Sequence, residues 1–266
     1  MAVSFHPVHL YRCLVCGQEG LNITEDRIYC PQCGQIYPLM HERIVDFLSP
    51  LPATPALSPA QSLAHTPLFA WGYERLWRPW SLSLLTGESF STEEEASLLR
   101  ELVGEASPVL DLGTAHGYWS RMLLNQQPEL TLIGVDNAVG VLREALHQIQ
   151  PQWPHYSLVR AQAEQLPLAT NSLQAVVIGA TLNELPLGPC LQEVARVLQP
   201  QGVLVSMHSQ RVDEGWGHWA QQALKLSGLQ FFSRDELTAA CEGVGLQVQR
   251  YLSYGVVAFI QAEVVK

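Results

Sequence analysis

The sequence is poor in positive charge. Of its 266 residues only two are lysine, Lys225 and Lys266, and the formal net charge is −10. Surfaces that bind nucleic acid gain most of their affinity by placing lysine and arginine against phosphates, and anionic membranes attract basic segments in the same way. The composition therefore disfavours a nucleic-acid partner and an anionic membrane surface. Peripheral membrane contact through aromatic side chains stays open.

Long apolar runs are also lacking. No stretch reaches the ~20 residues that a membrane-spanning helix needs. The first residues, MAVSFHPVHLYRC, lack the charged start and apolar block of a secretory signal, so we expect a cytoplasmic protein. Hydrophobic residues make up 47% of the chain and charged residues 15%, which is typical of a folded globular protein. The length allows one substantial α/β domain and one small unit.

Cysteine is scarce, and four of the six cysteines lie in one short segment. Two C-x-x-C pairs are separated by 13 residues, and a glycine follows each pair at once. Four thiolates on two glycine turns have the ligand number and spacing of a tetrahedral zinc site. Redox or disulfide pairs are the alternative, which a reducing compartment disfavours. The predicted ligands of a structural Zn²⁺ ion are Cys13, Cys16, Cys30 and Cys33.

The segment around these cysteines, residues 1–48, is predicted to be a zinc ribbon. Residues 21–29 alternate apolar and polar side chains on each side of a polar turn, which favours a short hairpin. A unit of this size cannot build a large apolar core, so we expect the metal to supply much of its folding free energy. The ribbon is acidic and suits phosphate poorly. Docking an unknown protein partner and supporting the next domain both remain open as its role.

Two segments connect the ribbon to the rest of the chain. Residues 49–67 contain five prolines and no charged residue, a composition typical of an extended linker. Residues 68–90 are rich in aromatic side chains, and Phe69, Tyr73 and Trp77 share one face of a predicted helix. This aromatic segment is either a lid over a bound ligand or a helix packed on the core of the next domain.

The most informative stretch is VLDLGTAHG, residues 109–117. An apolar strand at 108–112 ends in a loop of small residues, and a helical pattern follows over 118–127. Such a loop places backbone N–H groups at a helix start beside the end of a parallel strand, where ligands bind. Asp111 would repel a pyrophosphate but attract a ligand with ammonium and sulfonium groups. Asp136 ends a second strand, 130–135, where a carboxylate can accept from a ribose diol.

Further motifs extend this pattern. Residues 160–168, RAQAEQLPL, are similar to the G-D-A-x-x-L-P-F loop of the class I S-adenosylmethionine-dependent methyltransferases. Residues 171–178 are similar to their fourth strand, and residues 193–202, EVARVLQPQG, are similar to their E-x-x-R-V-L-x-P-G-G segment. Five matches in the family's order are far more specific than one glycine loop. The chain resembles this family from about residue 91 onwards. The ribbon and residues 71–81, WGYERLWRPWS, also resemble zinc-ribbon methyltransferases of photosynthetic bacteria and plastids.

The resemblance implies a Rossmann-like α/β fold over residues 91–266, with a seven-stranded, mostly parallel sheet and an antiparallel C-terminal strand. Ser91 and Glu94 form a capping box that predicts a helix to about Val103. The last two strands follow each other without a helix between them and are expected to form a hairpin. We expect strands at 108–112, 130–135, 156–160, 173–179, 202–208, 245–253 and 256–264.

The resemblance also implies S-adenosylmethionine as cofactor, with S-adenosylhomocysteine as product. Three positions depart from the family: Ala115 replaces a glycine, Gln162 an aspartate that contacts adenine, and Gln174 an aspartate that opens the fourth strand. Alanine still permits close approach and glutamine can accept from an adenine amino group, so we expect binding to be retained. The implied cofactor residues are Asp111, Gly113, Thr114, Ala115, Gly117, Asp136, Asn137, Val141, Gln162, Ala163 and Ala180.

The sequence leaves the catalytic residue open. Methyl transfer requires alignment of donor and acceptor and, for some acceptors, a base. Glu184 or His208 could act as a base, and Asn183 could orient an acceptor, although surface or structural roles explain each of them more simply. An Asn-Pro-Pro-Tyr motif and a cysteine just after the fourth or fifth strand are both absent from the sequence. Methylation of exocyclic amines and of cytosine C5 is therefore disfavoured.

Residues 210–232 are apolar and aromatic and, by the resemblance, shape the acceptor site. We therefore expect a methyltransferase that acts on a small, apolar, aromatic or quinone-like acceptor. One alternative is an RNA base methyltransferase, because a ribosomal guanine-N1 methyltransferase has a similar layout, but the net charge argues against it. Another alternative is a partner-binding module without catalytic activity on a degenerate methyltransferase fold.

Overall fold

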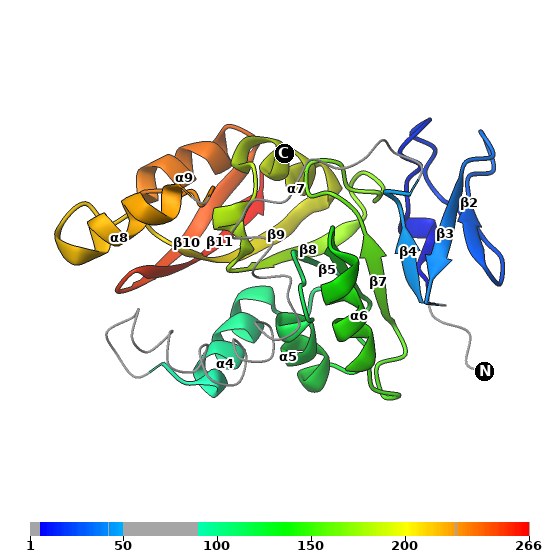
Figure 1. Cartoon of the computed structure of the whole chain (residues 1–266), viewed down its shortest axis with the longest axis horizontal. Helices are drawn as coiled ribbons and strands as arrows, with labels where there is room; N and C mark the ends of the chain where they lie inside the picture. The colour runs from blue at the N-terminus through cyan, green and yellow to red at the C-terminus, as the bar shows by residue number, and fades with distance from the viewer. Residues whose placement is uncertain (1–5, 42, 50–89, 227, 266) are drawn as a thin grey trace.

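The computed structural model describes residues 6–41, 43–49, 90–226 and 228–265. These residues form one eleven-stranded sheet with helices on both faces (Figure 1). The predicted linker, 49–67, and the predicted aromatic segment, 68–90, lie outside the described residues except for Ser49 and Phe90. Within the described ranges, no helix combines the length and the apolar character that crossing a membrane requires.

Seven strands make up the larger part of the sheet. Their order is β7-β6-β5-β8-β9-β11-β10, and neighbours run parallel except where β11 meets β9 and β10. The predicted mostly parallel sheet with an antiparallel C-terminal strand is therefore confirmed. The strands are β5 (Val109–Leu112), β6 (Leu132–Asp136), β7 (Tyr156–Arg160), β8 (Leu173–Gly179), β9 (Leu198–Ser209), β10 (Leu246–Tyr254) and β11 (Val257–Val264).

Helices cover the two faces of the sheet separately (Figure 1). One face carries α4 (Thr92–Val103), α5 (Tyr118–Gln126) and α6 (Val139–His147). The other face carries α7 (Leu187–Val197) and α9 (Arg234–Glu242), while α8 (Gly215–Lys225) projects beyond the hairpin edge. The predicted capping box starts α4, since Glu94 N donates to Ser91 Oγ at 3.1 Å and Ser91 N donates to Glu94 Oε2 at 2.6 Å.

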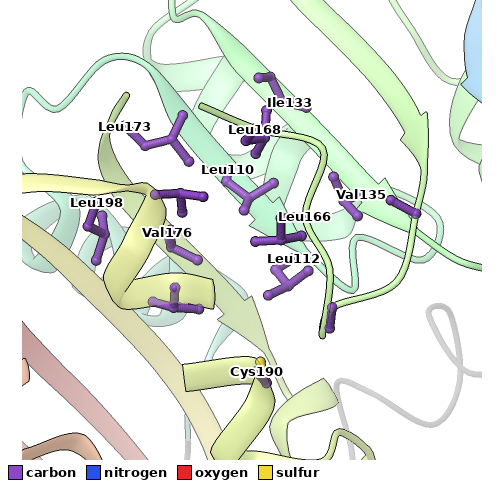
Figure 2. Packing of buried hydrophobic residues seen from close by; sticks show 14 of the residues in the cluster. Leu110, Leu112, Ile133, Val135, Leu166, Leu168, Leu173, Val176, Cys190 and Leu198 are labelled. Atoms are coloured by element: carbon purple, nitrogen blue, oxygen red, sulfur yellow. The ribbon is translucent and has the colours of Figure 1, made fainter. Parts of the chain in front are cut away.

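The side chains of β5 alternate between the two faces, as a pleated strand requires. Leu110 and Leu112 belong to a core cluster with residues of α7 and α9, whereas Val109 belongs to a cluster with residues of α4, α5 and α6. Figure 2 shows part of the first cluster, to which Leu166 and Leu168 of the loop after β7 also belong. Full burial of a leucine contributes roughly 1.5–3 kcal/mol. The apolar positions of this loop therefore hold it on the sheet.

The N-terminal segment continues the same sheet. After a short 3-10 helix, η1 (Val8–Leu10), it forms β1 (Asn22–Ile23), β2 (Arg27–Tyr29), β3 (Ile36–Met40) and β4 (Ile44–Asp46). Neighbours among these four strands are antiparallel, which confirms the predicted hairpin within 21–29. β4 then pairs in parallel with β7 and covers a strand edge that would otherwise be open. The predicted seven-stranded sheet is thereby extended to eleven strands.

Candidate cofactor site and metal centre

The loop after β5 has a backbone that requires small residues. Gly113 and Gly117 have φ values of 71° and 73°, and Ala115 has a φ of 46°. A Cβ atom on Gly113 would lie 2.7 Å from the side chain of Thr181, which is too close for an unstrained contact. Glycine at 113 is therefore required by both conformation and space. Alanine at 115 adopts the left-handed region with a side chain, which is less favourable.

Asp111 stabilises this loop by accepting hydrogen bonds from it and from the start of α5. Its side chain is buried, and its Oδ2 accepts from Thr114 Oγ1 at 2.8 Å, Ser120 Oγ at 2.6 Å and Ser120 N at 3.1 Å. Burial raises the pKa of Asp111, while the hydrogen bonds from Ser120 and Thr114 oppose that rise. The carboxylate thus connects the end of β5 to the first turn of α5. It is turned into the loop, whereas the sequence suggested a direct partner for a cationic ligand.

Asp136 stands at the tip of β6, next to the loop after β5. Its Oδ2 accepts from Ala115 N at 3.1 Å, and its Oδ1 accepts from Ala138 N at 2.9 Å. Because β5 and β6 are parallel neighbours, their carboxyl ends meet at one edge of the sheet. The adjacency of these two loops follows from the sequence pattern of strands and helices.

A cavity that opens to solvent lies at this edge, and the empty space within its outline is about 530 Å³ with open solvent included. The ends of β5 and β6, the segments that follow β7 and β8, and the 3-10 helix η3 (Thr181–Glu184) contribute to it. It is lined by Leu112, Gly113, Val135, Asp136, Asn137, Ala161, Ala163, Glu164, Thr181, Glu184, Leu185 and Pro186.

The structure brings four of the predicted cofactor residues onto this wall: Gly113, Asp136, Asn137 and Ala163. The others support it from behind or lie beside it. Thr114, Ala115 and Gly117 shape the loop after β5, and Val141 is buried in α6. Gln162 pairs through its backbone with Gln165, and Ala180 precedes η3 with a φ of 69°.

Several wall residues did not appear in the predicted cofactor set. Thr181, Leu185 and Pro186 follow β8 directly, and Glu164 lies in the loop after β7. Their position just after the carboxyl end of a parallel strand is the signal that could have identified them.

The three candidate catalytic residues have different environments. Glu184 lines the cavity, and burial together with the negative charge of Asp136 raises its pKa to about 7. His208 is 1% exposed within β9, and burial lowers its pKa to about 4, so its ring is neutral at pH 7. Only Glu184 of the three stands on the cavity wall.

Asn183 is part of the scaffold. Its Nδ2 donates to Ser209 O at 2.9 Å and to Gln230 O at 2.6 Å, and its Oδ1 accepts from Ser209 N at 2.8 Å. These bonds occupy the amide and connect η3 to the end of β9 and to the loop before α9. The suggestion that Asn183 orients an acceptor therefore finds no support in this geometry.

Comparison with known proteins gives this geometry a family. Residues 109–202 match a family model described as a methyltransferase domain. The chain contains an S-adenosylmethionine-dependent methyltransferase domain. The domain model begins with β5 and ends in β9, and therefore includes all the residues that line the cavity.

Two relatives show how far the similarity of the methyltransferase domain extends. The ubiquinone/menaquinone biosynthesis C-methyltransferase of Syntrophotalea carbinolica is 29% identical over 140 residues, which are 52% of this chain and 52% of that protein. An uncharacterized chloroplastic methyltransferase of Arabidopsis thaliana is 25% identical over 267 residues, covering 92% of this chain and 75% of its own length. The match to the quinone methyltransferase thus spans about half of that protein.

The fold of the methyltransferase domain also has solved counterparts. A chain from the complex between the Haloferax volcanii Trm112 methyltransferase activator and a methyltransferase superposes with a TM-score of 0.61 at 16% identity. The superposition covers 80% of this chain and 100% of that chain. At this level of identity the likeness shows the fold alone.

The four ribbon cysteines converge beside the methyltransferase domain. Their Sγ atoms all lie within 4.8 Å of one another, with separations of 3.7 Å for Cys13 and Cys33 and 3.5 Å for Cys16 and Cys30. Four sulfurs placed ~2.3 Å from a tetrahedral zinc ion would be about 3.8 Å apart. All six cysteines of the chain are free thiols. The donor set and its spacing therefore fit a Zn²⁺ ion.

Two glycine turns present these thiols. Gly17 N donates to Cys13 O at 2.9 Å and Gly34 N donates to Cys30 O at 3.0 Å, with φ values of 77° and 74° at the two glycines. The two turns share this hydrogen bond and the positive φ at glycine, and each turn contributes two sulfur atoms to the cluster. Tyr37 packs under the first turn, where its Oη accepts from Leu14 N at 2.9 Å.

Proposed function

We propose that this protein transfers a methyl group from S-adenosylmethionine to a small, apolar, ring-containing acceptor such as a quinone. The observation that carries the proposal is the cavity where Gly113, Asp136 and Glu184 meet at the carboxyl ends of parallel strands. When bound, S-adenosylmethionine supplies a methyl group on a positively charged sulfur. The chain's residues have to hold that donor and align an acceptor with it.

The cavity offers groups for the nucleoside and for the positively charged sulfur of the cofactor. Asp136 can accept from the two ribose hydroxyls, because its carboxylate stands at the tip of β6. Ala161, Ala163 and Leu185 provide apolar surface for the adenine. Gly113 lets the ligand approach the backbone closely. Glu184 adds a carboxylate that favours a cationic ligand over a neutral one.

We assign supporting roles to the other predicted cofactor residues. Asp111, Thr114 and Gly117 fix the loop after β5, Val141 packs α6 under it, and Gln162 and Ala180 set the direction of the next two loops. Cys13, Cys16, Cys30 and Cys33 hold a structural zinc ion in the ribbon, residues 1–48, and residues 91–266 form the catalytic unit. Six cysteines without a disulfide suit a reducing compartment, and we propose a cytoplasmic location.

An apolar acceptor is favoured by charge and by one relative. The net charge of −10 and the carboxylates of Asp136, Glu164 and Glu184 on the cavity wall make a nucleic-acid acceptor unfavourable. The ubiquinone/menaquinone biosynthesis C-methyltransferase of Syntrophotalea carbinolica is similar to this chain over 140 residues, which supports a quinone-like acceptor. If Glu184 is a base for a hydroxyl or carbon acid, it would remove the acceptor's proton during transfer.

Calorimetry with S-adenosylmethionine and S-adenosylhomocysteine tests the donor site. We expect one-to-one binding to the wild-type chain and a loss on the order of 100-fold in Asp136→Ala, because two hydrogen bonds to a charged group disappear. Asp136→Asn separates the charge from the shape of the side chain. Asp213→Ala, which removes an exposed acid outside the cavity, is the matched control and should bind like the wild type. Equal affinity in all four proteins would refute the proposal.

A transfer assay tests the acceptor class. We expect radiolabelled methyl groups to enter an extractable product when demethylated quinones or other apolar ring compounds are supplied. Label that enters RNA instead would overturn the proposed acceptor while preserving the donor. Binding of the donor with no transfer to either class would favour a partner-binding role.

A further inference from the structure

An ion pair connects β4, the last strand of the ribbon, to the residue that precedes Ala161 of the cavity wall. Asp46, at the end of β4, is 4% exposed. Its Oδ1 accepts from Leu48 N at 2.9 Å and from Ser49 N at 3.1 Å, and its Oδ2 accepts from Arg160 Nη1 at 3.2 Å. Each carboxylate oxygen therefore has a defined partner. The pair joins the ribbon to the end of β7.

Arg160 also contacts a residue that lines the cavity. Its Nε donates to the carbonyl oxygen of Asn137 at 3.0 Å, and Asn137 lines the cavity directly after Asp136. The backbone repeats the connection, since Phe47 N donates to Arg160 O and Ala161 N donates to Asp136 O, both at 3.0 Å. The guanidinium thus bridges the ribbon and the loop that holds the proposed ribose ligand.

A second contact reaches the loop after β7 from the zinc end of the ribbon. Arg12 N donates to Pro167 O at 3.0 Å and Ala169 N donates to Leu10 O at 2.7 Å, so the chain beside Cys13 pairs with this loop. Thr170 N also donates to Glu19 Oε1 at 2.8 Å. The loop carries Ala163 and Glu164 of the cavity wall.

The other side of the same loop is held by the methyltransferase domain itself. Leu166 N donates to Glu193 Oε2 at 2.7 Å, and Arg196 donates to the carbonyl oxygens of Leu166 and Leu168 at 3.0 and 2.8 Å. The loop therefore lies between α7 and the ribbon. Removal of either support leaves it held from one side only.

We propose that the ribbon is a positioning element for the nucleoside half of the cavity, with Asp46 as its main positioning residue acting through Arg160. The inference rests on the proposed function, because it assumes that the cavity binds an adenosine-containing cofactor. The ribbon then supports the cofactor-binding residues of its own chain. Methyl transfer itself takes place in the cavity.

Charge and burial explain why Asp46 should matter. A buried carboxylate that loses its guanidinium, or a guanidinium that loses its carboxylate, is left with an uncompensated charge. Arg160 is 24% exposed and can then turn towards water, releasing the carbonyl of Asn137. A small displacement there moves the ribose-binding loop, and binding depends steeply on such placement.

Asp46→Asn is the variant that isolates this effect. Asparagine keeps an oxygen for Leu48 N and Ser49 N but presents an amide to Arg160 in place of a carboxylate. We expect the dissociation constants of S-adenosylhomocysteine and of 5′-methylthioadenosine to rise by a similar factor, on the order of tenfold. 5′-Methylthioadenosine lacks the amino-acid part of the cofactor, so an equal loss assigns the effect to the nucleoside half.

Three controls separate positioning from general stability. In calorimetry, a structural defect lowers the fraction of binding-competent protein, whereas a positioning defect raises the dissociation constant at unchanged stoichiometry. In an Arg160→Gln background, Asp46→Asn should cause no further loss, because both act through one contact. Glu101→Gln breaks an ion pair with Arg250 that lies away from the cavity lining, and it should bind like the wild type. Glu19→Ala tests the second contact between the ribbon and the loop after β7. It removes the exposed carboxylate that accepts from Thr170 N, and it should weaken binding by roughly twofold to threefold.

The outcomes are distinguishable. Unchanged dissociation constants in Asp46→Asn and Glu19→Ala, with normal binding by the wild type, would overturn this inference and leave the proposed function intact. A loss for S-adenosylhomocysteine but not for 5′-methylthioadenosine would also overturn it. Failure of the wild type to bind either compound would instead refute the proposed function, on which the inference rests.

Discussion

The two edges of the sheet are built in different ways. At the β7 edge, a ribbon with four converging cysteines adds four strands, and a partly buried ion pair between Asp46 and Arg160 joins it to the end of β7. At the β10 edge, the sheet ends in a hairpin, and the neighbouring α8 leaves Trp219 71% exposed and Leu226 90% exposed. One edge carries a cysteine cluster that fits a metal ion and an ion pair, and the other presents apolar side chains to solvent. We infer that the first edge supports cofactor binding and that the second is adaptable.

The largest effect should come from removing one metal ligand at the ribbon edge. We expect Cys30→Ser to lose zinc and to lower the melting temperature by roughly 10 °C or more, because a small metal site contributes several kcal/mol to folding and each kcal/mol shifts the melting temperature by ~2–4 °C. Cys241→Ala, which removes a buried thiol of α9, should change the melting temperature by only a few degrees and keep the zinc. Metal analysis and thermal unfolding measure both. Equal melting temperatures would contradict the view that the ribbon edge is metal-fixed.

The next largest effect should come from the loop after β5. Gly113→Ala places a Cβ atom 2.7 Å from Thr181 at a φ of 71°. Strain and overlap together should weaken binding of S-adenosylhomocysteine roughly 100-fold. Adding Thr181→Gly removes all three overlapping atoms of Thr181, its Cβ included, but not the backbone strain at position 113, so about tenfold should return. A full recovery in the double variant would show that φ at this position is unimportant.

A smaller effect should appear in the pH dependence of donor binding. The pKa of Glu184 is raised to about 7, so its carboxylate gains charge as pH rises from 6 to 8. Affinity for the cationic S-adenosylmethionine should rise a few-fold over this range, and affinity for the neutral thioether S-adenosylhomocysteine should rise less. In Glu184→Gln the profile should be flat. Calorimetry at a series of pH values measures the dissociation constants of both ligands. Identical pH profiles for the wild type and the variant would show that Glu184 does not contribute to donor binding.

Glu184 affects the stability of the ligand-free protein with the opposite pH dependence: its contribution to the free energy of unfolding falls as pH rises. Its folded pKa of about 7 lies above the ordinary value of 4.5, so the native state favours the protonated form. That contribution is present below pH 4.5 and is lost as pH rises through about 7. Glu184→Gln should therefore reduce the loss of stability between these pH values, as measured by denaturant unfolding.

The smallest effect is expected at the hairpin edge. Trp219→Ser should change the free energy of unfolding by no more than about 0.5 kcal/mol, because the side chain is 71% exposed. The affinity for S-adenosylhomocysteine should stay within twofold of the wild type, since no residue of α8 lines the described cavity. A large loss of donor affinity would show that the two edges are not independent. A change in acceptor turnover alone would place the acceptor near α8.

Much of the fold could be read from the sequence because it depends on local patterns. The alternation of Leu110 and Leu112 with Val109, the capping box at Ser91, and the apolar runs ending at Asp136 each reflect a local rule. The meeting of Asp136 with the loop after β5 also follows, since parallel strands end at one edge. These features place the cavity without tertiary information.

The remaining features depend on contacts between distant parts of the chain. β4 is only three residues long and has no periodic signal, and Asp46 lies 114 positions before its partner Arg160. Asn183 and Glu184 are adjacent in sequence, yet the turn of η3 places one in the scaffold and the other on the cavity wall. Asp111 matched a family motif, but hydrogen bonds to Thr114 and Ser120 turn it into the loop.

The most direct test of the central claim is a crystal structure of the zinc-loaded chain with S-adenosylhomocysteine. We expect the ligand at the carboxyl ends of β5, β6 and β8, with its ribose hydroxyls within hydrogen-bonding distance of Asp136 and its adenine beside Ala163. A ligand bound elsewhere, or a cavity that stays empty at saturating ligand, would contradict it.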